Sequence, residues 1–91
     1  MVLQPSSDIA VRTFTIDSNA NVPYPIGTQL YFANRSAVNL SIAINADTMF
    51  LAGTTLTGTR SLAQNGIALA VKVETTVWII GGYTTKFSSL T

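Results

Sequence analysis

Few side chains of this sequence could act as acids or bases in a reaction. Four of them are carboxylates. They are Asp8, Asp17, Asp47 and Glu74, and all four lie in predicted turns or near the N-terminus. Two carboxylates that meet in a cleft can act as a general acid and base, but single acidic residues in turns are ordinarily solvated. Cysteine and histidine are absent, which excludes disulfides, cysteine-ligated zinc, thiol nucleophiles and the usual base of neutral pH.

Ser61 and Lys72 could be combined into a serine–lysine pair of nucleophile and base. No strained turn that would present a nucleophilic serine surrounds Ser61, so an exposed serine and a lysine on a strand face are the simpler interpretation. The glycines also do not fall in the spacing of a phosphate-binding loop. We therefore predict no catalytic residue, no cofactor and no metal site, and expect that the protein is not an enzyme.

Four aromatic side chains are candidates for stacking on nucleic acid or sugar: Tyr24, Tyr31, Phe32 and Phe50. Stacking proteins usually combine aromatic residues with a basic groove, whereas the basic residues here are spread singly along the chain. We expect Phe32 and Phe50 to pack in the core. Tyr24 and Tyr31 are expected to contact a glycan or a neighbouring subunit.

The low charge of the chain limits its partners. Only 10% of the residues are charged and the net charge is +1, whereas roughly 25% is usual for soluble domains. Such a chain has no strong field to attract nucleic acid or acidic lipid. Its mean hydropathy is nevertheless positive, and a short chain buries only about 60% of its surface. We expect the remaining apolar surface to be covered by other copies of the chain or by a larger structure.

The strongest structural signal is the stretch 66–82, which predicts a β-hairpin. Residues 67, 69, 71 and 73 alternate with small or charged residues, as in a strand with two different faces. A polar turn at 74–76 separates this run from Val77, Trp78, Ile79 and Ile80. Trp78 is the only tryptophan, and its large area makes it the expected centre of the core.

Further short strands are predicted at residues 11–16, 29–33, 39–44, 48–51 and 54–57. Residues 60–64 lead into Asn65 and Gly66, which indicate either a type I′ hairpin turn or a loop before the long strand. We therefore expect an all-β fold, a small antiparallel β-sandwich or barrel of about seven short strands. Residues 1–10 are expected to form an extended arm, residues 11–91 one β domain, and residues 83–91 a polar tail with Phe87 as a buried candidate.

No signal peptide is indicated near the N-terminus, and no apolar run approaches the ~18 residues of a membrane span. We expect a complete, short gene product that does not enter a membrane.

The order of features from Val22 to Gly82 resembles a β-domain of tailed-bacteriophage virion proteins, found in capsid decoration proteins and tail-fibre tips. The resemblance covers about two thirds of the chain and depends on a Pro-x-Gly-Thr segment that opens a strand and a Thr-x-Trp strand that closes the domain. In this sequence these are Pro25, Gly27 and Thr28, and Thr76 with Trp78. Gly82 follows the closing glycine where the family often has an acidic residue, and Asn65 stands where it often has an aromatic one.

The resemblance implies a virion structural protein, commonly a homotrimer. A chain too short to contain a fibre shaft favours a capsid decoration or cement protein, which would bind the major capsid protein or other virion proteins. The alternative is a tail-fibre or tail-tip module that binds a host receptor or glycan through loops near residues 34–37, 52–53 and 58–61. The expected subunit or partner contacts are Val2, Leu3, Ile9, Tyr24, Tyr31 and Trp78.

Overall fold

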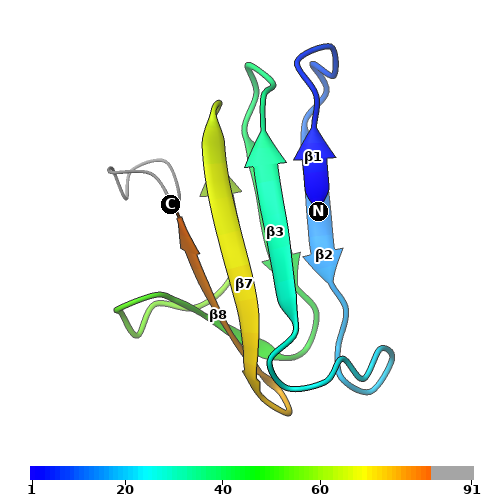
Figure 1. Ribbon diagram of the computed structural model, residues 1–91, viewed down its shortest axis with the longest axis vertical. Helices are drawn as coiled ribbons and strands as arrows, with labels where there is room; N and C mark the ends of the chain where they lie inside the picture. The colour runs from blue at the N-terminus through cyan, green and yellow to red at the C-terminus, as the bar shows by residue number, and fades with distance from the viewer. Residues whose placement is uncertain (83–91) are drawn as a thin grey trace.

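The computed structural model describes residues 1–82, which form eight β-strands in two packed sheets (Figure 1). The strands are β1 (Val2–Gln4), β2 (Arg12–Ile16), β3 (Gln29–Asn34), β4 (Leu40–Ile44), β5 (Thr48–Leu51), β6 (Arg60–Leu62), β7 (Gly66–Glu74) and β8 (Val77–Gly82). Sheet A has the order β1-β3-β7-β8-β5, and sheet B has the order β2-β4-β6. The expected polar tail and its Phe87 lie outside the described residues.

The predicted all-β sandwich is confirmed, but its sheets are mixed and not purely antiparallel. The pairs β1–β3, β2–β4 and β5–β8 are parallel, and the pairs β3–β7, β4–β6 and β7–β8 are antiparallel. The reason is that the chain passes from one sheet to the other after every strand from β1 to β6. Two strands of one sheet are therefore often separated in sequence by a strand of the other sheet. Such strands can run in the same direction and pair in parallel, as β1 and β3 do.

The predicted hairpin is present as β7 and β8, with a bulge between Lys72 and Glu74. Asn65 and Gly66 do not turn a hairpin, because β6 pairs in sheet B and β7 in sheet A. Asn65 instead adopts a left-handed φ of 64° in the loop between them. Gly66 fits a tight space, since a Cβ there would lie 2.9 Å from the backbone oxygen of Ala63 and close to the Leu62 side chain. The expected strand at residues 54–57 is reduced to one bridge, between Thr57 and Phe50.

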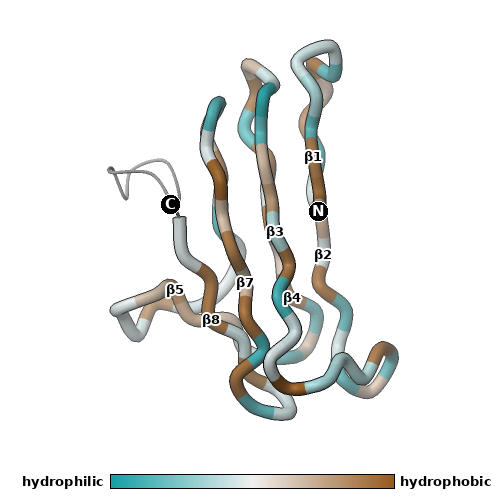
Figure 2. Tube along the Cα trace, in the orientation of Figure 1, coloured by the Kyte–Doolittle hydropathy of each residue, from teal (hydrophilic) through white to brown (hydrophobic). Residues whose placement is uncertain are grey.

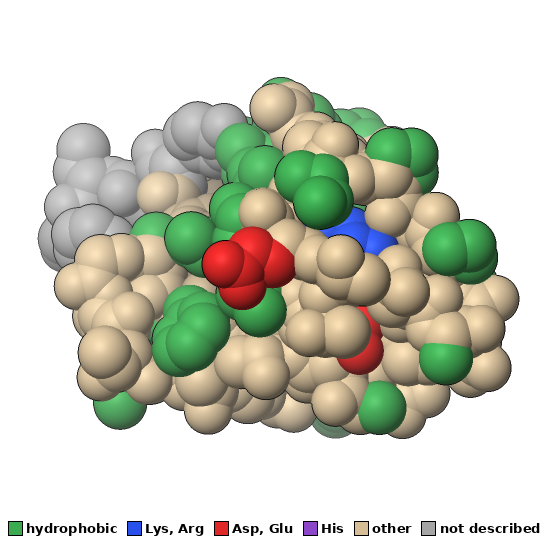
Figure 3. Space-filling view, turned by 90° about the horizontal axis from the view of Figure 1, so that it is seen from below, with side chains coloured by type: hydrophobic (Ala, Val, Ile, Leu, Met, Phe, Trp, Pro, Cys, Tyr) green, Lys and Arg blue, Asp and Glu red, His purple; other side chains and the backbone are tan. Residues whose placement is uncertain are grey.

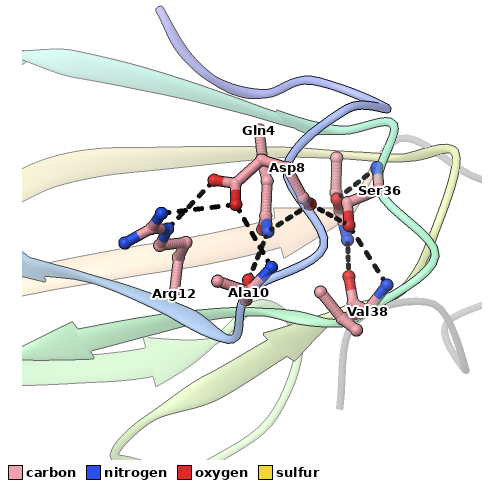
Figure 4. Close-up of polar contacts among 7 residues, drawn as sticks. Gln4, Asp8, Ala10, Arg12, Ser36 and Val38 are labelled. Carbon is pink, nitrogen blue, oxygen red and sulfur yellow. Dashed lines mark hydrogen bonds and ion pairs between the residues drawn. The ribbon is translucent and has the colours of Figure 1, made fainter.

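The expected N-terminal arm is not confirmed, because residues 2–4 form the edge strand β1 beside β3. Polar contacts then fix the segment that follows (Figure 4). The Gln4 amide nitrogen donates to the carbonyl oxygen of Ala10 at 2.9 Å, and the Ser36 hydroxyl donates to the carbonyl oxygen of Asp8. Arg12 donates to the Asp8 carboxylate at 3.0 Å. Residues 1–10 are thus part of the sandwich.

The core lies between the two sheets, where alternate residues of each strand point inward. Trp78 is fully buried, as expected for the centre of the core, and Tyr24 packs edge-on against it with ring centroids 5.6 Å apart. Figure 2 shows the apolar segments concentrated on the strands and the polar ones on the connections. The buried apolar residues are Ile16, Phe32, Leu40, Ile42, Met49, Leu62, Ala68, Ala70, Trp78 and Ile80.

Candidate functional site

Large apolar side chains cover the outward face of sheet A. In β7 the small residues Ala68 and Ala70 point into the core and are buried. Because successive side chains of a strand point to opposite faces, the larger residues Ile67, Leu69 and Val71 point outward. Ile67 is 47% exposed and Ile79, on the neighbouring strand, is 38% exposed.

Cross-strand register places these outward residues in three rows across the sheet. We call the three rows together the sheet A face. The rows are Leu3, Ala33 and Ile67; then Tyr31, Leu69 and Gly81; then Gln29, Val71, Ile79 and Phe50. Phe32 is in the core as expected, but the same expectation for Phe50 is wrong.

A shallow depression of about 220 Å³ opens on the sheet A face. Leu69 and Val71 of β7 line one side, and Ile79, Gly81 and Gly82 of β8 line the other, together with Ala52. Because glycine has no side chain, the end of β8 leaves space beside the aliphatic side chains of β7. The face therefore carries both a ridge and a hollow.

Polar groups on the sheet A face are few and partly satisfied. The Tyr31 hydroxyl donates to Gln29 Oε1 at 2.9 Å, so it needs no further partner when the face is covered. No charged residue of the described chain belongs to the three rows; Arg35 follows β3 and Glu74 ends β7, at opposite ends of the face. Figure 3 views the molecule from the end at which β7 turns into β8, and few charged side chains appear there.

The outward face of sheet B has a different chemistry. Its central row consists of Thr13, Ser41 and Ser61, which are cross-strand neighbours, and the next row pairs Thr15 with Ala43. Hydroxyl groups lose hydrogen bonds to water when they are covered by an apolar surface. The two outer faces of the sandwich are thus unequal, and only the sheet A face is apolar.

The six expected contact residues are divided between surface and interior. Leu3 and Tyr31 lie on the sheet A face, with exposed fractions of 51% and 41%. Ile9 is 76% exposed but lies in the loop between β1 and β2.

The remaining three expected contacts pack inside the chain. Val2 and Tyr24 pack against the core. Trp78 is fully buried, so its expected role as a subunit contact is wrong. Its side chain packs against residues of the same chain, including Tyr24.

The sequence interpretation did not identify Ile67, Leu69, Val71 and Ile79 as surface residues. A signal was available in the hairpin, because Ile79 follows Trp78 directly and must point to the opposite side of β8. If Trp78 is the core centre, Ile79 faces outward, and Val71, its cross-strand partner, does so too.

Lys72 lies on a strand face, as expected, but this is the inward face of β7 and the side chain is buried. The residue is only 1% exposed. Its ammonium group donates to Asn19 Oδ1 at 2.7 Å and to the carbonyl oxygen of Tyr24 at 2.8 Å. These bonds fasten the long connection between β2 and β3 onto β7. Ser61 lies on β6 in the other sheet, so the hypothetical serine–lysine pair has no structural support.

Asp8, Asp17 and Asp47 each accept hydrogen bonds from donors of the fold. Asp17 accepts from the Asn45 amide at 2.9 Å, and also from Asn21 and the backbone of Ser18. These hydrogen bonds, that of Asn45 first, lower the pKa of Asp17. Asp47 accepts from the backbone N–H of Asn19 at 2.8 Å. Both side chains stabilise turns by holding backbone and amide groups in place.

The Asp8–Arg12 ion pair predicts a stability change in acid. The hydrogen bond from Arg12 and that from the Ala10 backbone lower the pKa of Asp8 below its ordinary value of 3.8. The charged form is therefore favoured by folding, and its contribution is present above pH 3.8 and is lost as the pH falls through the lowered pKa. Asp8→Asn should lower the thermal midpoint at neutral pH, and the difference from wild type should shrink in acid.

The measurement is a series of melting curves of both proteins from about pH 7 to about pH 2. Glu74→Gln, at the exposed end of β7, is the control and should not change the midpoint. An Asp8→Asn protein that melts with the wild type at neutral pH would show that the ion pair contributes nothing to the folded state.

The loops that were expected to bind a receptor do not form one surface. The turn after β3 lies at the top of the view in Figure 2, and the loop after β5 lies at its lower left. Among residues 1–82 there is no group of three or more side chains that could hold a metal ion. The same residues contain no helix capable of crossing a membrane.

The sheet A face is therefore the surface whose geometry bears most directly on function. Its chemistry suits the binding of another apolar surface. Searches against protein-family models, curated proteins and solved structures found no match to the chain.

Proposed function

We propose that this protein is a structural component of a bacteriophage virion, a capsid decoration or cement protein that binds the capsid surface as a homotrimer. The observation that carries the proposal is the sheet A face, an apolar surface without charged residues on a small, weakly charged domain. The largest apolar patch on a small protein is often a functional one. The resemblance of residues 22–82 to virion β-domains specifies the kind of assembly.

Decoration requires stable packing, and several ionisable side chains contribute to it. Asp8 forms an ion pair with Arg12, Asp17 stabilises a turn, and Lys72 holds the loop between β2 and β3. The N-terminal segment is folded into sheet A, so the capsid contact is assigned to the exposed surface of the sandwich and not to a free arm.

The first test is the mass of the purified protein in solution, alone and after mixing with capsids stripped of accessory proteins. We expect a species of three times the 9.7 kDa chain mass that sediments with the capsids. Empty buffer and capsids that retain their accessory proteins serve as controls, because the latter have their sites occupied. A stable monomer that leaves capsids unbound would contradict the proposal.

If the trimer did not bind capsids but attached to host cells, the second candidate function, a tail-fibre or tail-tip module, would be favoured over capsid decoration.

A further inference from the structure

We infer that the sheet A face is the self-association surface, and that the three copies of this face meet around the threefold axis of the proposed homotrimer. The inference rests on the proposed self-association and adds the surface and the contacting residues. Four properties of the face support it: its size, its lack of charge, its relief and its contrast with sheet B.

The size of the face suits the centre of a protein–protein interface. The three rows hold ten residues, and with strands about 4.8 Å apart and rows about 6.6 Å apart they cover roughly 300 Å² in projection. Patches of about 300–600 Å² are the largest that typical monomers leave exposed. Stable interfaces bury about 800 Å² per partner, so this face would supply the apolar centre and the surrounding edges would supply the rim.

The distribution of charge favours a second copy as the partner. No charge lies within the rows, so one face can cover another without desolvating an unpaired ion. Arg35 and Glu74 stand beyond the rows at the two ends, where the rim of an interface stays hydrated. A partner with a charged surface would leave its own charges without counter-ions on this face.

The relief of the face allows neighbouring copies to interlock. Leu69 and Val71 project from β7, and the depression of about 220 Å³ lies beside them, lined also by Ile79, Gly81 and Gly82 of β8. Aliphatic side chains of a second copy can enter this hollow. Side chains of sheets that pack together interdigitate, as these ridges and hollows would around a threefold axis. The hydrogen bond from Tyr31 to Gln29 keeps the phenol satisfied inside such an interface.

Sheet B provides the matched control surface on the same molecule. Its outward row of Thr13, Ser41 and Ser61 has similar backbone geometry but carries hydroxyl groups. Packing this row against an apolar surface would leave those groups without partners. We therefore expect the association to use sheet A and not sheet B.

Charge substitutions test the surface directly. In Leu69→Arg a cation would be buried between copies, so the mass in solution should fall to that of a single 9.7 kDa chain. Thr13→Arg, on sheet B, should keep the wild-type mass. Near-ultraviolet circular dichroism of the buried Trp78 confirms that both variants are folded. A folded Leu69→Arg protein with the wild-type mass would overturn the inference, as would a wild-type protein that is a monomer.

Cysteine cross-linking tests it without inserting a charge. The chain has no cysteine, so Leu69→Cys, Val71→Cys and Ile79→Cys each create a single thiol near the middle of the face. At least one should form a disulfide-linked pair under mild oxidation, because Cβ atoms must approach to about 3.8 Å for the bond. Ser41→Cys, on the central strand of sheet B, should stay unlinked. If none of the three linked more than Ser41→Cys, the inference would be wrong.

The two proposals fail separately. An assembly that cross-links through sheet A but does not bind capsids would contradict the decoration function alone. An assembly that binds capsids but links through another surface would contradict this inference alone.

Discussion

Replacing Lys72 with alanine is expected to lower the free energy of unfolding by about 2–5 kcal/mol, since two partly buried acceptors lose their donor and the buried lysine stem leaves a cavity. The ammonium group bonds to Asn19 Oδ1 and to the carbonyl oxygen of Tyr24, and the residue is 1% exposed. Alanine would leave both oxygens without this donor and a cavity where the stem had been. The backbone bonds of residue 72 to Thr28 and Gly27, at 2.9 and 2.7 Å, are unaffected by the change.

Two variants separate the causes of this loss. Lys72→Met keeps a long apolar stem and fills most of the volume, so it should be destabilised less than Lys72→Ala. Asn19→Ala removes only one acceptor and leaves the bond to Tyr24. Chemical denaturation of the three variants gives the free energies. If Lys72→Ala were as stable as wild type, the lysine would not fasten the connection between β2 and β3.

Replacing Trp78 with alanine should lower the free energy of unfolding by about 3–5 kcal/mol. Trp78 is fully buried in the middle of the core, and its ring contacts Tyr24 edge-on with centroids 5.6 Å apart. Alanine would remove that aromatic pair and leave a large cavity between the sheets. The variant protein should unfold at a clearly lower denaturant concentration.

Trp78→Phe is the matched control. Trp78 Nε1 donates to no protein acceptor within residues 1–82, so phenylalanine removes apolar area without breaking a hydrogen bond of the described chain. We expect its cost to be well below that of alanine. If both variants lost the same free energy of unfolding, the position would not tolerate any change in shape. Burial of an aromatic ring would then not be the main contribution of Trp78 to stability.

Much of the fold was predictable because alternation is a local property of the sequence. Strand residues such as Leu40, Ile42 and Ile44 show it directly, and the hairpin of β7 and β8 has a polar turn between two strands. β1 was missed because three residues are too short to show a period. The parallel pairs were missed because they depend on which sheet each strand joins, which no single segment specifies.

The candidate surface was less predictable for a related reason. Alternation in residues 67–73 shows that β7 has two faces but does not show which one is inward. The choice depends on the opposing side chains: large residues such as Trp78, Phe32 and Ile42 already fill the interior, so Ala68 and Ala70 fit there. Lys72 is on the same inward face and is accommodated because Asn19 and Tyr24 supply acceptors from a distant loop.

The strand order has a consequence for how the chain folds during synthesis. Within residues 1–82, β7 and β8 are the only consecutive strands that pair; every other pair closes a longer loop. Closing a long loop costs more entropy and slows folding. In sheet A, β3 lies between β1 and β7. The pairing of β3 with β7 therefore has to wait until the ribosome has made the hairpin of β7 and β8. The hairpin is therefore the expected nucleus, and the N-terminal strands emerge first but are completed last.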